Sequence, residues 1–150
     1  MNIVAALFIE GIDLRQVDGP STRIDLTGVQ FSAAAPEPYP LTWSPHLVVI
    51  LHAPQDHGGT AVLEAVFRRE GDAPDAEPLA RNVQPLEVEP GKFSYRLVRA
   101  ELGFDEPGTV YAHCRVDMGP EVVVPYTLLD HIESADAPKE TEWKAASEDG

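Results

Sequence analysis

Short stretches in which apolar and polar residues alternate, separated by turns rich in glycine and proline, run through most of this 150-residue chain. A period of two places every second side chain on the same face of an extended strand, so the pattern predicts strands with one buried face. The turns recur at the spacing typical of antiparallel sandwiches. We therefore predict an all-β, antiparallel sandwich of about seven to eight strands, chosen from residues 3–9, 23–31, 47–53, 60–69, 83–88, 93–102, 109–116 and 121–129.

Three stretches and two single residues refine this prediction. Residues 47–53 are almost continuously apolar, which is typical of a central strand covered on both faces. Residues 60–69 fit a helix or a strand by periodicity, and we predict a strand because the run is short and flanked by glycines. Residues 32–45 are rich in proline and predict a long irregular connection. Gly28 indicates a bulge or a close backbone approach, and Pro125 indicates an edge position or a bulge in the last strand.

The alternation also predicts which side chains of the strand at 93–102 point inward. Phe93, Tyr95 and Leu97 share one face, and we expect that face to be the buried one. A slip at Val98 would then pass the inward direction to the even-numbered residues that follow.

The strongest turn signal lies at residues 105–108. Pro107 presets φ and Gly108 permits a positive φ, and a strand signal follows at once. This turn followed by Tyr111 resembles the corner of immunoglobulin-like sandwiches, in which a tyrosine ties the strand back to the preceding loop. The resemblance implies structural roles for Pro107, Gly108 and Tyr111, and an immunoglobulin-like architecture. Unlike in antibody domains, the cysteine lies three residues after the tyrosine, at Cys114, and has no partner.

A longer pattern covers most of residues 2–129. The chain combines, in order, an apolar first strand, the run Ile24-Asp25-Leu26-Thr27-Gly28-Val29, a central apolar strand, and Phe104-x-x-Pro107-Gly108-x-x-Tyr111 leading to Val116-Asp117. This pattern resembles a group of small, uncharacterised bacterial β-sandwich proteins with no assigned activity. The resemblance implies a sandwich domain and no particular chemistry.

Composition narrows the classes of partner. The formal net charge is −14, from 25 acidic and 11 basic residues, so we expect neither nucleic acid nor an anionic membrane surface as a partner. Cys114 is the only cysteine, so no disulfide within the chain is possible. The first residues lack the features of a secretion signal and no segment has the length of a membrane span, so we expect a cytoplasmic protein. Residues 1–129 are predicted to form the domain, and the polar, acidic residues 130–150 a disordered tail.

If each strand crosses the sandwich once, successive loops alternate between its two ends. One end then collects residues 32–45, 70–82 and 103–107, where acidic side chains would surround two aromatic ones. Such a cluster suits calcium or a cationic ligand, with the aromatic rings as a platform, although solvated acidic loops are the commoner explanation. The candidate ligand-binding residues are Tyr39, Trp43, Asp72, Asp75, Asp105 and Glu106.

The other end collects residues 10–22, 54–59, 89–92 and 118–120. His52, Asp56 and His57 lie beside these loops and offer imidazole and carboxylate groups, which zinc accepts. They form the candidate metal site of a metal-dependent hydrolase or ligand-binding domain, which is the alternative function. Surface histidines in a turn are the simpler interpretation.

Covalent catalysis finds no support in the pattern. His113 and Cys114 are adjacent on a strand and point to opposite faces, so the imidazole is not a base for the thiol. Cys114 is in phase with Val110 and Val116, which predicts a small core residue.

The tail segment 140–146, ETEWKAA, could present Trp143 to a partner. We therefore predict a non-catalytic module without a cofactor, which binds another protein or itself through a sheet face, a sheet edge or the end loops.

Overall fold

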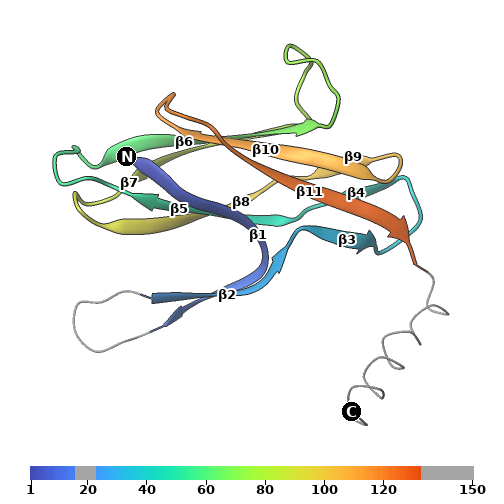
Figure 1. The fold of residues 1–150 in the computed structure, drawn as a ribbon, viewed down its shortest axis with the longest axis horizontal. Coiled ribbons are helices and arrows are strands. Elements are labelled where there is room, and N and C mark those ends of the chain that lie inside the picture. Colours follow the sequence, from blue (N-terminus) through green and yellow to red (C-terminus); the bar gives the residue numbers. More distant parts are fainter. Residues whose placement is uncertain (16–22, 133–150) are drawn as a thin grey trace, which may run out of the picture.

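The computed structural model describes residues 1–15 and 23–132, and these residues form strands and no helix (Figure 1). The all-β prediction is confirmed for this part of the chain. The described strands number eleven, more than the seven or eight expected. They are β1 (Asn2–Arg15), β2 (Arg23–Gln30), β3 (Ser32–Ala35), β4 (Leu41–Trp43), β5 (His46–His52), β6 (Thr60–Arg69), β7 (Ala80–Glu87), β8 (Phe93–Arg99), β9 (Leu102–Phe104), β10 (Gly108–Val116) and β11 (Val122–His131).

The strands form two main sheets and one small ribbon. The first sheet has four antiparallel strands in the order β2-β1-β5-β8. The second has five strands in the order β3-β11-β10-β6-β7, in which β3 and β11 run parallel and the other pairs are antiparallel. β4 and β9 pair in the ribbon. Sequence-adjacent strands are thus often in different sheets, which requires the two sheets to fold together.

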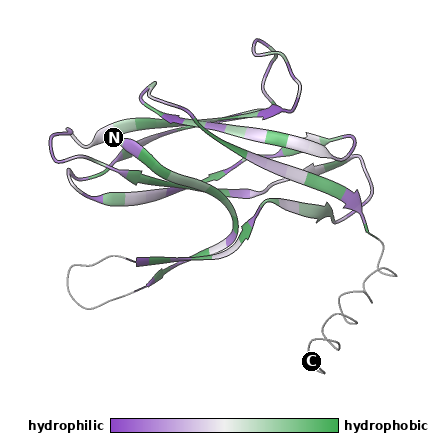
Figure 2. Ribbon diagram, viewed as in Figure 1, coloured by the Kyte–Doolittle hydropathy of each residue, from purple (hydrophilic) through white to green (hydrophobic). Residues whose placement is uncertain are grey.

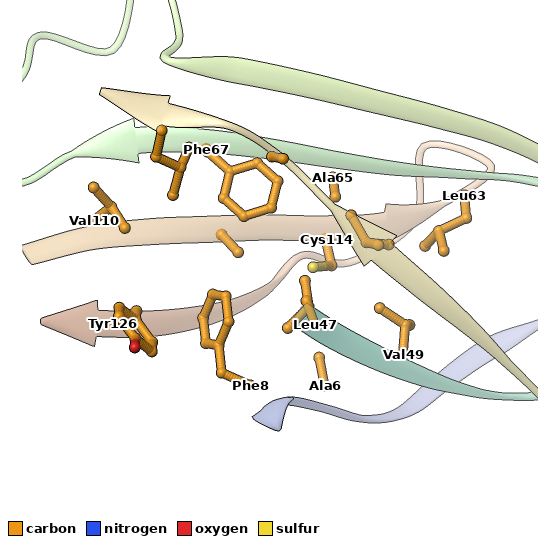
Figure 3. Packing of buried hydrophobic residues seen from close by; sticks show 14 of the residues in the cluster. Ala6, Phe8, Leu47, Val49, Leu63, Ala65, Phe67, Val110, Cys114 and Tyr126 are labelled. Carbon is orange, nitrogen blue, oxygen red and sulfur yellow. The ribbon is translucent and has the colours of Figure 1, made fainter. Parts of the chain in front are cut away.

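One hydrophobic core lies between the two main sheets (Figure 3). Phe8 of the four-stranded sheet meets Tyr126 of the five-stranded sheet edge-on, with ring centroids 4.9 Å apart. In β10 every second residue from Val110 to Val116 is buried, as the period-two pattern predicts. Cys114 is one of these residues, and its predicted role as a core residue is confirmed. Burial raises the pKa of its thiol to about 12, with a smaller contribution from Glu121.

Several of the finer predictions are confirmed. Residues 60–69 form strand β6. β5 is a central strand, and at Val48 it is covered on both faces, because this side chain is fully buried although it points away from the core between the sheets. Gly28 has a φ of 62° and lies so close to Glu10 that a Cβ atom there would come within 2.6 Å of its side chain. Among the described residues, no strand pairs with the outer side of β11 at Pro125, because pairing with β3 begins at Thr127.

Residues 32–45 are not one irregular connection, because they contain β3 and β4. Both strands are very short, of four and three residues, and their backbone partners in β11 and β9 are distant in the sequence. A local hydrophobic pattern cannot reveal a strand of this length, since the hydrogen bonds that define it come from elsewhere in the chain.

The predicted inward face of β8 is wrong. Val98 points into the core, whereas Phe93 and Leu97 on the other face are 62% and 46% exposed. The prediction failed because the more apolar face of β8 points outward, whereas the face with Val98 also carries Ser94 and Arg96, so the alternation of residue types indicated the wrong face. Figure 2 shows how strongly hydrophobic the neighbouring strands β1 and β5 are.

The four-stranded sheet carries an unusual extension. Residues 2–9 of β1 pair with β5, and β1 then continues, bends and runs back beside β2 (Figure 1). We call residues 11–15 and 23–27 the arm. Within it Ile12 pairs with Leu26 and Leu14 with Ile24, so their apolar side chains share one face. Among the described residues none forms a helix of the length and apolarity that crossing a membrane requires.

Candidate functional site

The predicted acidic site is only partly assembled. Asp105 and Glu106 line a hollow of about 210 Å³ together with Arg69 and Glu70. Asp72 instead lines a separate hollow beside Tyr111 on the outer side of the five-stranded sheet. Asp75 is exposed in a turn in which the N–H of Ala76 donates to the carbonyl of Ala73. The candidate carboxylates therefore do not converge on one point.

The two aromatic residues expected at that end, Tyr39 and Trp43, contact the fold itself. The hydroxyl of Tyr39 donates to the carbonyl oxygen of Leu129 at 2.6 Å. Burial, and secondarily the nearby carboxylate of Asp130, raises the pKa of Tyr39. The indole of Trp43 packs against the core, and its nitrogen is buried. The predicted aromatic platform beside the acidic loops is not formed, because Trp43 points inward.

The predicted metal ligands also have other partners. The Nδ1 atom of His57 accepts a hydrogen bond from the N–H of Gly59 at 2.9 Å. The ring of His52 lies against Phe93, with centroids 4.5 Å apart. Within residues 1–15 and 23–132 no three His, Cys, Asp or Glu side chains are arranged to hold a metal ion. His52, Asp56 and His57 are thus close along the chain without forming a coordination site.

The corner after the 105–107 bend differs from the one expected. Gly108 begins β10, and Pro107 lies in the bend before it, as the turn signal predicts. The hydroxyl of Tyr111 donates to Oε1 of Glu70 at 3.4 Å, rather than to the backbone of the preceding loop. Among the described residues it is Tyr39 whose hydroxyl donates to a backbone carbonyl, that of Leu129.

A different feature, which the sequence did not predict, is a cleft between the arm and the outer face of the four-stranded sheet. We call it the arm cleft. Its volume is about 530 Å³, and it is lined by Leu14, Ile24, Ile50, Gly91, Lys92, Phe93, Ser94 and Tyr95. The alternation of loops between the two ends of the sandwich predicts that residues 10–22 lie near residues 89–92. Leu14 does lie beside residues 91–95, because the arm folds back toward them. Residues 16–22 lie outside the described part of the chain.

Both walls of the arm cleft are apolar and open to solvent. On the sheet side Ile50 lies opposite Tyr95, next to the pair of His52 and Phe93. Phe93 is 62% exposed, and Leu14 on the arm side is 64% exposed. Clefts of this volume with mostly apolar walls are typical of binding sites. An outer sheet face in a solvated sandwich is more commonly polar, so this surface is the strongest candidate for recognition.

Two outer edges of the sheets carry features that oppose strand addition. On β8 the guanidinium of Arg96 donates to the carbonyl of Tyr95, and the amide of Gln84 donates to the carbonyl of Leu97. On β7 Pro85 lacks an N–H group. Side-chain caps and prolines are known ways of protecting an edge strand from pairing with another chain.

The other two edges are interrupted or short. Gly28 has a positive φ in the middle of β2, and β3 has four residues. Together with the protected edges of β7 and β8, these features favour recognition through a sheet face over recognition through an edge.

The charge of the arm cleft differs from that of the whole chain. Its lining includes the ammonium group of Lys92 and no carboxylate, although the chain carries a net charge of −14. The sequence signal that could have indicated this surface is the second apolar face of β5, in which every residue from 47 to 51 is apolar, beside the apolar face of β8 with Phe93 and Tyr95. No protein-family model matches this sequence, and no curated protein matches it.

Proposed function

We propose that this protein is a non-catalytic interaction module that binds a polypeptide partner in the arm cleft. The observation that carries the proposal is the open apolar cleft between the arm and the outer face of β5 and β8. Covering exposed side chains of the cleft such as Leu14 and Phe93 would contribute roughly 1 kcal/mol each to a complex. A handful of such contacts is enough for a specific but reversible interaction.

The proposal places the partner on a sheet face. The capped carbonyls of β8 and Pro85 of β7 make pairing at those edges unfavourable, whereas the face beside them has exposed apolar side chains. An immunoglobulin-like classification belongs to the same proposal. It is supported by two mainly antiparallel sheets that enclose one core, an architecture on which many unrelated binding sites are built.

Affinity capture from a lysate of the native host tests the proposal with three forms of the chain. The wild type is compared with Phe93→Ser, which removes an aromatic wall of the cleft, and with Phe31→Ser as the matched control. Phe31 is also an exposed phenylalanine, 76% accessible, and does not line the cleft. Thermal unfolding first checks that all three are folded.

We expect a partner that the wild type and Phe31→Ser retain and that Phe93→Ser loses. The interaction with the purified partner should then weaken at least about tenfold in Phe93→Ser, as for a central aromatic contact. Equal retention by the two variants would refute the cleft as the binding surface, and so would a wild type that retains nothing.

A further inference from the structure

The arm cleft has a definite chemical preference. Its walls are aliphatic and aromatic, and its charged group is the ammonium of Lys92. A suitable occupant therefore has a large apolar side chain with a carboxylate close by in the sequence, since the apolar surface would be buried and the carboxylate would lie near the ammonium.

One segment of this chain outside the described residues has this composition. Residues 140–146 read ETEWKAA, so Glu140 and Glu142 precede Trp143 and Lys144 follows it. Trp143 is the one aromatic residue after position 132. Residues 133–150 carry six acidic and two basic residues, which gives a net charge of −4. The segment is thus complementary to the cleft in both apolar and ionic character.

The chain is long enough to bring the two together. The last strand ends at His131, and β11 runs parallel to β3 and antiparallel to β10. The end of β11 and the start of β8 lie at opposite ends of the sandwich (Figure 1), so any segment that joins the end of β11 to the arm cleft has to span much of the sandwich. Tyr126 of β11 lies level with Leu47 of β5, because Phe8 contacts the first and pairs with the second. The five steps from Tyr126 to His131 and the three from Leu47 to Ile50 in the cleft together span roughly 26 Å. The eleven steps along the chain from position 132 to Trp143 reach about 36 Å when extended.

We propose that in the free protein Trp143 of the same chain occupies the arm cleft, with Glu140 or Glu142 near Lys92. This inference rests on the proposed function, because it names a competitor for the same surface. A tethered segment has an effective concentration of about 1 mM, so even a weak contact keeps the cleft partly filled. The partner must displace the segment, and the segment therefore lowers the affinity of the module for its partner.

Nuclear magnetic resonance of the full chain tests the inference through the indole N–H signals. The chain has two tryptophans, Trp43 and Trp143, and Trp143→Phe assigns their signals. The reference is a synthetic peptide of residues 138–149. We expect the Trp143 signal of the wild type to be displaced from its position in the peptide, and to move back toward that position in Phe93→Ser and in Lys92→Glu. The matched control Phe31→Ser should leave it unchanged.

The remaining outcomes overturn the inference. A wild-type Trp143 signal that coincides with that of the free peptide means that the cleft is empty. A displaced signal that returns on dilution means that the segment of a second copy is bound, which contradicts occupancy within one chain. A displaced signal that Phe93→Ser and Lys92→Glu leave unchanged places the segment elsewhere. None of these results affects the capture experiment with the external partner, so the proposed function stands or falls separately.

Discussion

The hydroxyl of Tyr126 is a strong test of how this core is built. The side chain is fully buried and its ring packs on Phe8. The hydroxyl oxygen is buried without a hydrogen-bond partner among the described residues, and so is the indole nitrogen of Trp43. Burial raises the pKa of Tyr126, an effect that the neighbouring Trp43 N–H opposes and Glu10 adds to. Trp43 is thus close to the hydroxyl without reaching hydrogen-bonding geometry.

Replacing Tyr126 with Phe should therefore stabilise the fold. A buried polar group without a partner costs about 1–3 kcal/mol, whereas a satisfied hydroxyl contributes about 1 kcal/mol. The substitution removes the hydroxyl and keeps the ring and its contact with Phe8. We expect the free energy of unfolding to rise by about 1 kcal/mol. If the hydroxyl were hydrogen-bonded, the same substitution would instead lower the free energy of unfolding by a similar amount.

Equilibrium unfolding in urea, followed by circular dichroism, measures the difference. The matched control is Tyr39→Phe, which removes a hydroxyl that donates to the carbonyl of Leu129 at 2.6 Å. We expect the control to be less stable than the wild type by about 0.5–1 kcal/mol. If Tyr126→Phe is destabilised as much as the control, the hydroxyl has a partner in solution and the reasoning fails. A double-mutant cycle with Trp43→Phe would then show whether that partner is the indole.

Further predictions concern three other side chains. Glu64→Gln should cost about 1–3 kcal/mol at neutral pH, because the carboxylate accepts hydrogen bonds from two arginines. These contacts lower the pKa of the Glu64 carboxyl. The ionised carboxylate therefore contributes its full share to the free energy of unfolding above the ordinary carboxyl pKa, and this share is lost as the pH falls through the lowered pKa. We expect the stabilities of the variant and the wild type, measured by unfolding at acidic pH, to become equal. The thiol of Cys114 is buried and should react with a thiol reagent only on unfolding, and rapid labelling of the folded protein would contradict its position. Tyr111→Phe should change the melting temperature little, because its hydroxyl meets the exposed carboxylate of Glu70 at 3.4 Å.

The outward face of β8 shows how far a local pattern can be interpreted. Period two correctly groups Phe93, Tyr95 and Leu97 on one face. It cannot say which of the two faces is turned toward the other sheet, because that depends on the register with β5 and on what lies beyond the sheet. The face that was expected to be buried is the one that forms the wall of the arm cleft.

The loop residues show a second limit. His52, Asp56 and His57 are close in the sequence, but the turn uses His57 to accept a backbone hydrogen bond and the strand places His52 against Phe93. Proximity along the chain gives no information on where a side chain points once a turn has formed. The same holds for Trp43, which was expected beside the acidic loops and instead packs against the core.

By itself the sequence determined the all-β class, most strand positions, the burial of Cys114 and the places where the chain turns. These properties depend on local alternation and on the backbone preferences of glycine and proline, which act within a few residues. Only the tertiary structure decided that β1 continues past Ile9 into the arm, that the arm folds back toward Phe93, and that a cleft with Lys92 results. The reason is that backbone pairing between distant strands, and the covering of a second apolar face, depend on contacts far apart in the chain, which no local pattern contains.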